Sequence, residues 1–229
     1  MRGFKGFTGA LLFLTCTLVF VGYPAFSQQT GSSDELRNAW GFDVMVSDGG
    51  LGVGGFHWRE ITPTIAGFIS LSVSESKDSR EVEFYNPWTG QNFVPGKVNR
   101  FFVIPLQAGI QYRLFKDQIM DNFRPFVSAG LGPSMIYSTP YERSFFNALG
   151  YGKAHYTVGG FIGAGAYIGS DPSNLVGINF RYYYVPYFSG INSMDRSIIE
   201  PGETLDQREF IQKKQFGGFY LTFTFGMAR

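Results

Sequence analysis

The stretch from Val98 to Phe115 alternates between apolar and polar residues with a period of two. Successive side chains of a β-strand point to opposite faces, so this pattern predicts a strand with one apolar face. Strands of soluble proteins average about five or six residues, and this one is roughly three times as long. A long strand of this kind is typical of a chain that crosses a bilayer as part of a closed barrel. The apolar face comprises Phe102, Ile104, Leu106, Ala108, Ile110, Tyr112 and Leu114.

Seven further segments show strand patterns, although the glycine-rich second segment leaves its inward and outward faces undefined. Turns after the second, fourth and sixth segments are short, whereas loops after the third, fifth and seventh are long, as in outer-membrane barrels with short periplasmic turns. The sequence therefore predicts an all-β fold, an eight-stranded antiparallel up-and-down transmembrane β-barrel with both termini in the periplasm. The predicted strands are Trp40–Val46, Leu51–Glu60, Thr62–Ser74, Val98–Phe115, Arg124–Tyr137, Ala154–Gly169, Leu175–Phe188 and Lys213–Met227.

The composition agrees with a membrane barrel. Of 229 residues, 30 are Gly, 25 are Phe and 13 are Tyr, and charged residues make up only 16%, below the roughly 25% of typical soluble proteins. The mean hydropathy is −0.03, which argues against a bundle of membrane helices, since only alternate residues of a barrel strand face lipid. The net charge of +1 indicates no broad basic surface, so no nucleic-acid partner is expected.

The N-terminal segment predicts export. A basic start is followed by an apolar stretch too short to span a bilayer and by small residues for cleavage in Ala25-Phe26-Ser27, the pattern of a secretory signal peptide. We therefore expect a signal peptide at residues 1–27, a flexible leader at 28–38 and an outer-membrane β-barrel at 39–229, located in the outer membrane of a Gram-negative cell. The one cysteine, Cys16, lies in the signal peptide, so no disulfide is expected.

The chain resembles the OmpA/OmpX-like small outer-membrane barrels. The resemblance rests on the glycine-rich strands Arg124–Gly132 and Gly160–Ala166 and on the aromatic final strand Gly218–Phe225, and it extends over nearly all of the mature chain. In that family the last strand usually ends at a terminal aromatic residue that serves as an assembly signal. The resemblance therefore implies the barrel assembly machinery as a partner, although Gly226–Arg229 follows the last aromatic residue here.

The inward positions predict the chemistry of the lumen. An eight-stranded barrel is just wide enough for its own side chains to fill, so a structural lumen is expected, with a narrow small-solute channel as an alternative. Charges inside must be paired or hydrated, and we expect Asp43 to face Arg181 or Arg113. The lumen candidates are Asp43, Gln107, Gln111, Arg113, Asn179 and Arg181.

Two histidines, His57 and His155, bear on catalysis. In His155-Tyr156-Thr157 the first and third residues share a face, which is similar to the His-x-Ser pair of outer-membrane lipid hydrolases, with threonine replacing serine. Nucleophilic hydrolysis needs a serine within reach of a histidine, so a serine beside His155 in the folded barrel would favour a lipid-modifying enzyme of the deacylase or acyltransferase type. Because Tyr156 takes the lipid face, we expect His155 to line the barrel mouth and predict no enzymatic activity, no metal site and no cofactor.

The long loops mix aromatic residues with charges of both signs. Solvated loops are the plainer interpretation, but clustered exposed aromatic side chains mark contact sites. The sequence therefore predicts a non-enzymatic outer-membrane barrel with a structural or surface-interaction role, whose partners are membrane lipids and an extracellular ligand bound by the loops. The loop contact candidates are Tyr85, Trp88, Tyr141 and Phe145.

Overall fold

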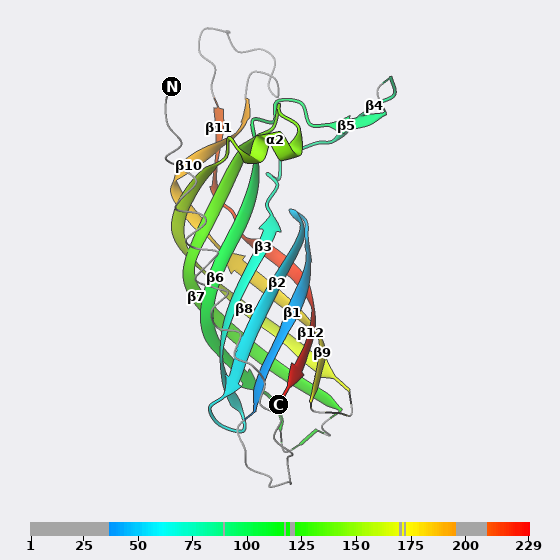
Figure 1. Cartoon of the computed structure of the whole chain (residues 1–229), viewed down its shortest axis with the longest axis vertical. Coiled ribbons are helices and arrows are strands. Elements are labelled where there is room, and N and C mark those ends of the chain that lie inside the picture. The colour runs from blue at the N-terminus through cyan, green and yellow to red at the C-terminus, as the bar shows by residue number, and fades with distance from the viewer. Residues whose placement is uncertain are drawn as a thin grey trace. The chain divides into compact units, whose positions relative to one another are not determined.

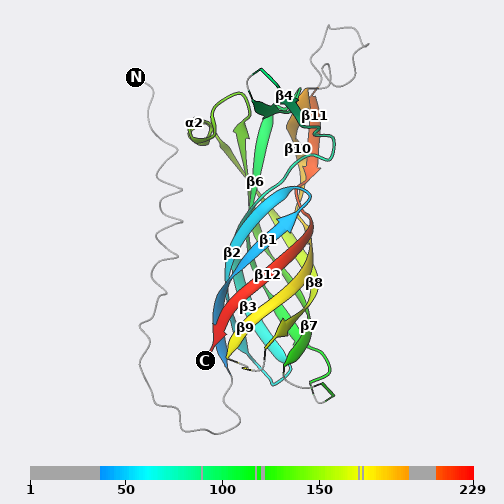
Figure 2. The same ribbon diagram turned by 90° about the vertical axis from the view of Figure 1, so that its right-hand side faces the viewer.

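The computed structural model describes residues 37–229 apart from residues 89, 117, 120, 121, 170, 172 and 196–209, so the predicted signal peptide lies outside the described residues. Eight strands form a closed antiparallel barrel (Figures 1 and 2), and β1 closes the ring by pairing with β12. The predicted fold class is confirmed. The barrel strands are β1 (Asn38–Ser47), β2 (Gly50–Glu60), β3 (Ile65–Glu75), β6 (Asn99–Arg113), β7 (Phe123–Pro140), β8 (Lys153–Ile168), β9 (Asn174–Tyr184) and β12 (Gly218–Ala228).

Side chains along the barrel strands alternate between the outer face and the lumen. In β1, Phe42 is 54% exposed on the outer face, whereas its neighbour Asp43 is 3% exposed. The phase of the glycine-rich β2, which the sequence left undefined, is set by pairing with β1 and β3. Leu51 and Val53 face outward there and Trp58 faces the lumen. The outer face is therefore a continuous band of apolar side chains.

This apolar band is tall enough to span a bilayer. Along β8, exposed outward side chains run from Ile168, at the end of the barrel with the short turns, to Tyr156, toward the end with the long loops. These residues are about twelve steps apart, which at about 3.3 Å per residue and a tilt of about 40° gives a height of roughly 30 Å. The hydrocarbon core of a bilayer is also about 30 Å thick.

The end of the barrel with the long loops, called the outer end, carries elements that lie largely in segments predicted as loops. The segment after β3 contains a small hairpin of β4 (Phe84–Asn86) and β5 (Gln91–Phe93), and the segment after β7 contains the short helix α2 (Phe145–Leu149). β10 (Pro186–Asp195) and β11 (Phe210–Gln215) form a two-stranded sheet above the barrel (Figure 1). Among the described residues, no helix is long and apolar enough to cross a membrane.

Two predicted strand ends are wrong by more than three residues. The last barrel strand begins at Gly218 rather than Lys213, because the residues before it pair with β10 instead of with the barrel. The change of direction occurs at Phe216, whose side chain is fully buried, and at Gly217, where a Cβ atom would collide with the backbone of β9.

The seventh barrel strand ends at Tyr184 and does not continue to Phe188 as predicted. Val185 interrupts it and is fully buried. The amide of Phe216 donates to the carbonyl of Val185 at 3.0 Å. The two interruptions therefore lie opposite each other, and the chain leaves and re-enters the barrel at the same point of the rim.

Two apolar clusters fill the lumen on either side of a polar middle. The outer cluster consists of Met45, Phe101, Val103, Ile136, Phe161, Tyr183, Val185, Ile191, Phe216 and Tyr220. The cluster at the end with the short turns consists of Ala39, Trp58, Ala66, Phe126, Tyr167, Leu175 and Ala228.

Candidate functional sites in the lumen and the outer loops

An ion pair crosses the polar middle of the lumen between β1 and β9. Asp43 accepts a hydrogen bond from Arg181 Nη1 at 2.7 Å and another from Thr224 Oγ1 at 2.6 Å. The side chains of Asp43 and Arg181 are 4% and 13% exposed, and the guanidinium lies over the Phe161 ring, 5.3 Å from its centroid. Of the two arginines considered for Asp43, the structure brings Arg181 to it and leaves Arg113 elsewhere.

The two lumen glutamines lie on β6, and each makes its own contact with β8. Gln107 donates to the carbonyl of Gly159 at 3.3 Å. The Tyr167 hydroxyl donates to Gln111 Oε1 at 3.2 Å. Each contact joins β6 to a residue of β8, which lies two strands away around the ring, so these side chains brace the barrel across its interior.

The remaining lumen candidates border small cavities or have no polar contact. Arg113 lines a cavity of about 50 Å³ toward the end of the barrel with the short turns, and two further lumen cavities measure about 20 and 10 Å³. One water molecule needs roughly 10–15 Å³ of such space, so these cavities have room for a few water molecules. Asn179 is 1% exposed, and its side chain makes no hydrogen bond within the described part of the chain.

Apolar side chains close the outer mouth of the barrel. Phe101 and Phe216 meet edge to face with ring centroids 5.2 Å apart, and Ile136 and Val185 belong to the same cluster. Each of these four side chains is at most 1% exposed. We call Phe101, Ile136, Val185 and Phe216 the mouth plug.

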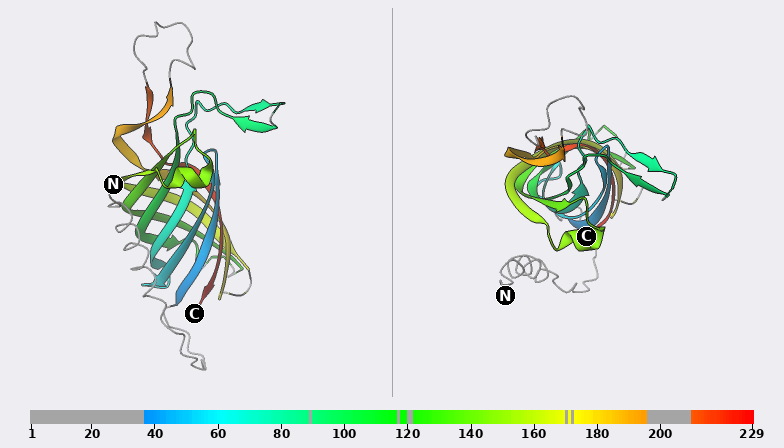
Figure 3. Two further views of the ribbon diagram at one scale, coloured as in Figure 1. Left: turned by 45° about the horizontal axis from the view of Figure 1, so that its top comes forward. Right: turned by 90° about the horizontal axis from the view of Figure 1, so that it is seen from above.

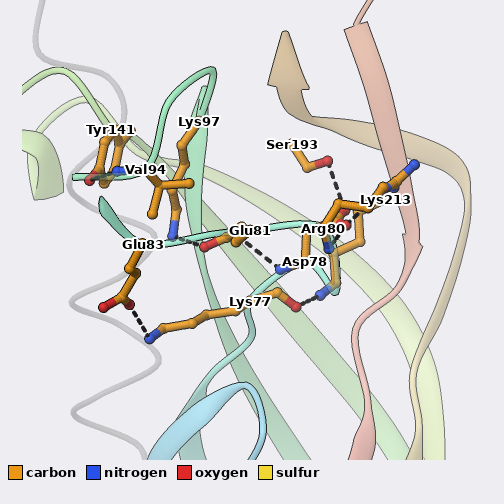
Figure 4. Close-up of polar contacts among 10 residues, drawn as sticks. All are labelled: Lys77, Asp78, Arg80, Glu81, Glu83, Val94, Lys97, Tyr141, Ser193 and Lys213. Atoms are coloured by element: carbon orange, nitrogen blue, oxygen red, sulfur yellow. Dashed lines mark hydrogen bonds and ion pairs between the residues drawn. The ribbon is translucent and has the colours of Figure 1, made fainter. Parts of the chain in front are cut away.

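A buried polar layer joins the loops above the mouth plug. Figure 4 shows the contacts within this layer. Asp78, in the loop after β3, accepts hydrogen bonds from Ser193 Oγ at 2.9 Å and from Arg80 Nε at 2.8 Å. Because Ser193 belongs to β10, the first contact ties together segments 115 residues apart in sequence. Burial alone would raise the pKa of Asp78, but the hydrogen bonds from Arg80 and Ser193 prevail and lower it to about 2.

A second buried pair extends the same layer. Lys97 Nζ lies 2.5 Å from Glu81 Oε2, and the two side chains are 5% and 3% exposed. Lys213 of β11 donates to the carbonyl of Lys77, and burial lowers the pKa of Lys213 against the attraction of nearby carboxylates. We call Asp78, Glu81, Lys97, Ser193 and Lys213 the loop brace.

Sequence reasoning did not find the loop brace. Four of its residues fall in segments interpreted as polar loops, and Lys213 falls at the start of the predicted last strand. The available signal was the run Lys77–Glu83, which mixes both charge signs. That run does not reveal its partners, since Ser193 is 115 residues from Asp78 and Lys213 is 136 residues from Lys77.

The four loop contact candidates differ in exposure. Tyr85 and Trp88, on the β4–β5 hairpin, are 65% and 94% exposed, and Phe145 in α2 is 47% exposed. Tyr141 is half-buried, and its hydroxyl accepts a hydrogen bond from the Val94 amide at 3.1 Å. Tyr141 therefore connects two loops (Figure 4), and the other three side chains are available at the surface.

A serine lies beside His155. Ser138 Oγ is 3.2 Å from His155 Nε2, and the Tyr187 hydroxyl is 3.3 Å from the other ring nitrogen, Nδ1. Ser138 is buried, and its hydroxyl is also placed to donate to the carbonyl of Lys153 at 3.3 Å. Thr157, which the sequence suggested as a nucleophile, donates instead to the backbone of β10.

The second histidine lies far from this pair. His57 is exposed on β2, where it is paired with Trp40 of β1 toward the end of the barrel with the short turns. The described residues contain no group of three or more His, Cys, Asp or Glu side chains that could hold a metal ion.

Comparison with known proteins returned matches among solved structures. No family model matches the chain, and no curated protein matches it. The N-terminal β-barrel domain of Pseudomonas aeruginosa OprF is 15% identical, with 85% of this chain and 97% of that chain covered and a TM-score of 0.45. Neisserial surface protein A is 10% identical, with 84% and 94% covered and a TM-score of 0.44. The attachment invasion locus protein of Yersinia pestis is 11% identical, with 84% and 96% covered and a TM-score of 0.37.

Each of the three is similar to this chain over most of its length at low sequence identity. The eight-stranded barrel itself rests on the strand pairing of this chain.

Proposed function

We propose that this protein is a non-enzymatic, non-conducting outer-membrane barrel that holds a preorganised contact surface at the cell exterior. The observation that carries the proposal is the loop brace above the mouth plug. Buried charges are stable only with partners, and here the loop brace fixes the loops after β3 and β9 against each other. Ordering these loops before binding lowers the entropy cost of binding.

The membrane placement is supported by the apolar band. Side chains such as Phe42, Leu51 and Ile162 would be unfavourable as a surface in water, whereas a closed barrel leaves no unpaired strand edge in lipid. The test compares boiled and unboiled outer-membrane fractions on denaturing gels. A different migration of the unboiled band is expected, and a soluble periplasmic protein without such a shift would contradict the placement.

The closed lumen is supported by the mouth plug, by the Asp43–Arg181 pair and by the small size of the lumen cavities that the described residues line. Reconstitution in a planar bilayer should therefore give no steady ion conductance. Stable single-channel openings of the wild-type protein would favour the small-solute channel instead.

The contact surface is supported by the β4–β5 hairpin. Its strands are joined by the cross-strand pair Phe84–Phe93, with ring centroids 6.2 Å apart. The hairpin exposes Tyr85 on β4 and Trp88 in the turn that follows. A photo-crosslinking amino acid at position 88, tested on intact cells, should capture a defined extracellular ligand. The matched control places it at Phe123, exposed at the other end of the barrel. Equal labelling from both positions would contradict a contact role for the hairpin.

A second candidate, a lipid-modifying enzyme, is favoured by one observation, the 3.2 Å contact between Ser138 and His155. Two features weigh against it. Nδ1 of His155 contacts the Tyr187 hydroxyl rather than a carboxylate, and Ser138 is buried, whereas a nucleophile needs an oriented base and access to substrate.

A fluorophosphonate probe distinguishes the two candidates, because it labels an activated serine. We expect no labelling of the detergent-solubilised barrel. Labelling that disappears in Ser138→Ala but persists in the matched Ser134→Ala variant would favour the enzyme.

A further inference from the structure

Helix α2 lies against the outside of the barrel wall. Phe145 meets Phe102 edge to face with ring centroids 6.0 Å apart, and the Tyr137 hydroxyl donates to the carbonyl of Leu149. Phe102 and Tyr137 are paired residues of β6 and β7, on the face that carries the apolar band farther down. Seen from above, α2 sits outside the ring of strands (Figure 3). The helix is therefore held beside the lipid-facing wall at its outer rim.

The side chains that α2 and its flank expose are mainly aromatic. Phe146 is 84% exposed and Tyr151 is 59% exposed, whereas Ala148 is buried. The exposed aromatic side chains continue onto β8, where Tyr156 lies outward near the top of the apolar band. Aromatic residues concentrate at membrane–water interfaces. The surface of α2 is thus continuous with the lipid-facing surface, which indicates lipid as its partner.

Three cations surround this aromatic surface. Arg100 is two residues above Phe102 on the same face of β6, and its Nη1 donates to the carbonyl of Arg143 at 3.1 Å. The Arg143 guanidinium lies 3.8 Å from the centroid of the Tyr151 ring. Lys153 is exposed at the start of β8.

One carboxylate, Glu142, lies in the same loop, so positive charge predominates locally. Arginine matches the geometry of phosphate oxygens, and clusters of basic residues beside a membrane span bind anionic headgroups.

We infer that this surface binds a phosphorylated lipid headgroup of the outer leaflet. We call Arg100, Arg143, Phe145, Phe146, Tyr151 and Lys153 the lipid collar. The cations bind the phosphate oxygens, and the aromatic side chains enter the boundary between headgroups and acyl chains. The inference rests on the membrane placement proposed above and adds a ligand class to it. A soluble phosphate would use the cations but not the aromatic side chains.

The test measures binding of bisphosphorylated lipid A to the protein purified from outer membranes in detergent, by native mass spectrometry. The Arg100→Gln/Arg143→Gln variant should bind about tenfold more weakly or worse, since each cation near an anionic surface contributes to binding. Arg59→Gln is the matched control, because Arg59 is exposed on β2 near the periplasmic end, and it should bind like the wild type. Phe146→Ser should also weaken binding, whereas dephosphorylated lipid A should bind the wild type weakly.

Unchanged lipid A binding by the Arg100→Gln/Arg143→Gln variant would overturn the lipid collar. Displacement of lipid A by inorganic phosphate, with no effect of Phe146→Ser, would overturn it in favour of a site for the free anion. Heat-modifiability of the same preparations tests the membrane placement separately from the lipid collar. A missing gel shift would overturn the membrane placement, whereas a normal shift with unchanged binding would overturn only the lipid collar.

Discussion

Removing Asp43 should destabilise the barrel more than removing both members of its ion pair. In Asp43→Ala, the guanidinium of Arg181 remains buried without its carboxylate, and Thr224 loses its acceptor. The Asp43 side chain is only 4% exposed, so water cannot readily replace it. Removing one partner of such a buried pair costs about 3–5 kcal/mol. The double variant Asp43→Ala/Arg181→Met also removes the orphaned charge and should recover most of that loss.

The measurement is the free energy of unfolding by urea in phosphatidylcholine vesicles, followed by tryptophan fluorescence and by gel mobility. The matched control is Asp43→Ala/Arg113→Met, which removes the arginine that the structure does not bring to Asp43, and it should not recover stability. The reasoning would be refuted if Asp43→Ala were within about 1 kcal/mol of the wild type. It would equally be refuted if both double variants were no more stable than Asp43→Ala.

Three further predictions concern the loop brace, the mouth plug and the barrel wall. The pKa of Asp78 falls from 3.8 to about 2 on folding. The ionised carboxylate therefore stabilises the folded state by about 2 kcal/mol above pH 4, and this stabilisation is lost as the pH falls through 2. Hydrogen exchange in the loop after β3, corrected for intrinsic rates, should therefore accelerate over that range in the wild type but already be fast at pH 6 in Asp78→Asn. Phe216→Ala should lower the free energy of unfolding by about 3–5 kcal/mol, whereas Trp88→Ala, on an exposed side chain, should change it by less than about 0.5 kcal/mol. Gly132→Ala should reduce the fraction of protein that migrates as the folded barrel on unboiled gels, because its Cβ would strike the backbone of β6. Gly55→Ala has room for a Cβ and should fold normally.

The outward face of most barrel strands could be predicted from the sequence. Lipid favours apolar side chains at alternate positions, so the apolar residues of each strand identify the side that faces the membrane. Ile110 and Phe180 lie on the outer face as their pattern predicted. β2 is the exception, because glycine has no side chain to mark a face. Pairing with β1 and β3 placed Leu51 outside and Trp58 inside.

The partner of Asp43 could not be chosen from the sequence. Arg181 and Arg113 both alternate inward and both are long enough to reach across a narrow lumen. The choice follows from the order and register of the ring. β12 lies between β1 and β9, and it pairs Thr224 with Asp43 and, four residues away, Tyr220 with Arg181. Arg181 therefore lies within side-chain reach of Asp43. The stagger of the strands therefore sets the height at which each inward charge lies.

Alternation along the chain is a local property, and it was sufficient to predict the closed barrel, its eight strands and its lipid-facing surface. The mouth plug, the loop brace and the Ser138–His155 contact are not local. The segments that form them run through bends at Val185 and Phe216 and through hairpins whose partners are distant in sequence. A buried charge such as Asp78 is stable only where the fold supplies its donors, and one of those donors, Ser193, comes from 115 residues away. Only the tertiary structure determines which residues meet in these sites, because the alternating pattern of the sequence does not indicate which loops lie together above the barrel.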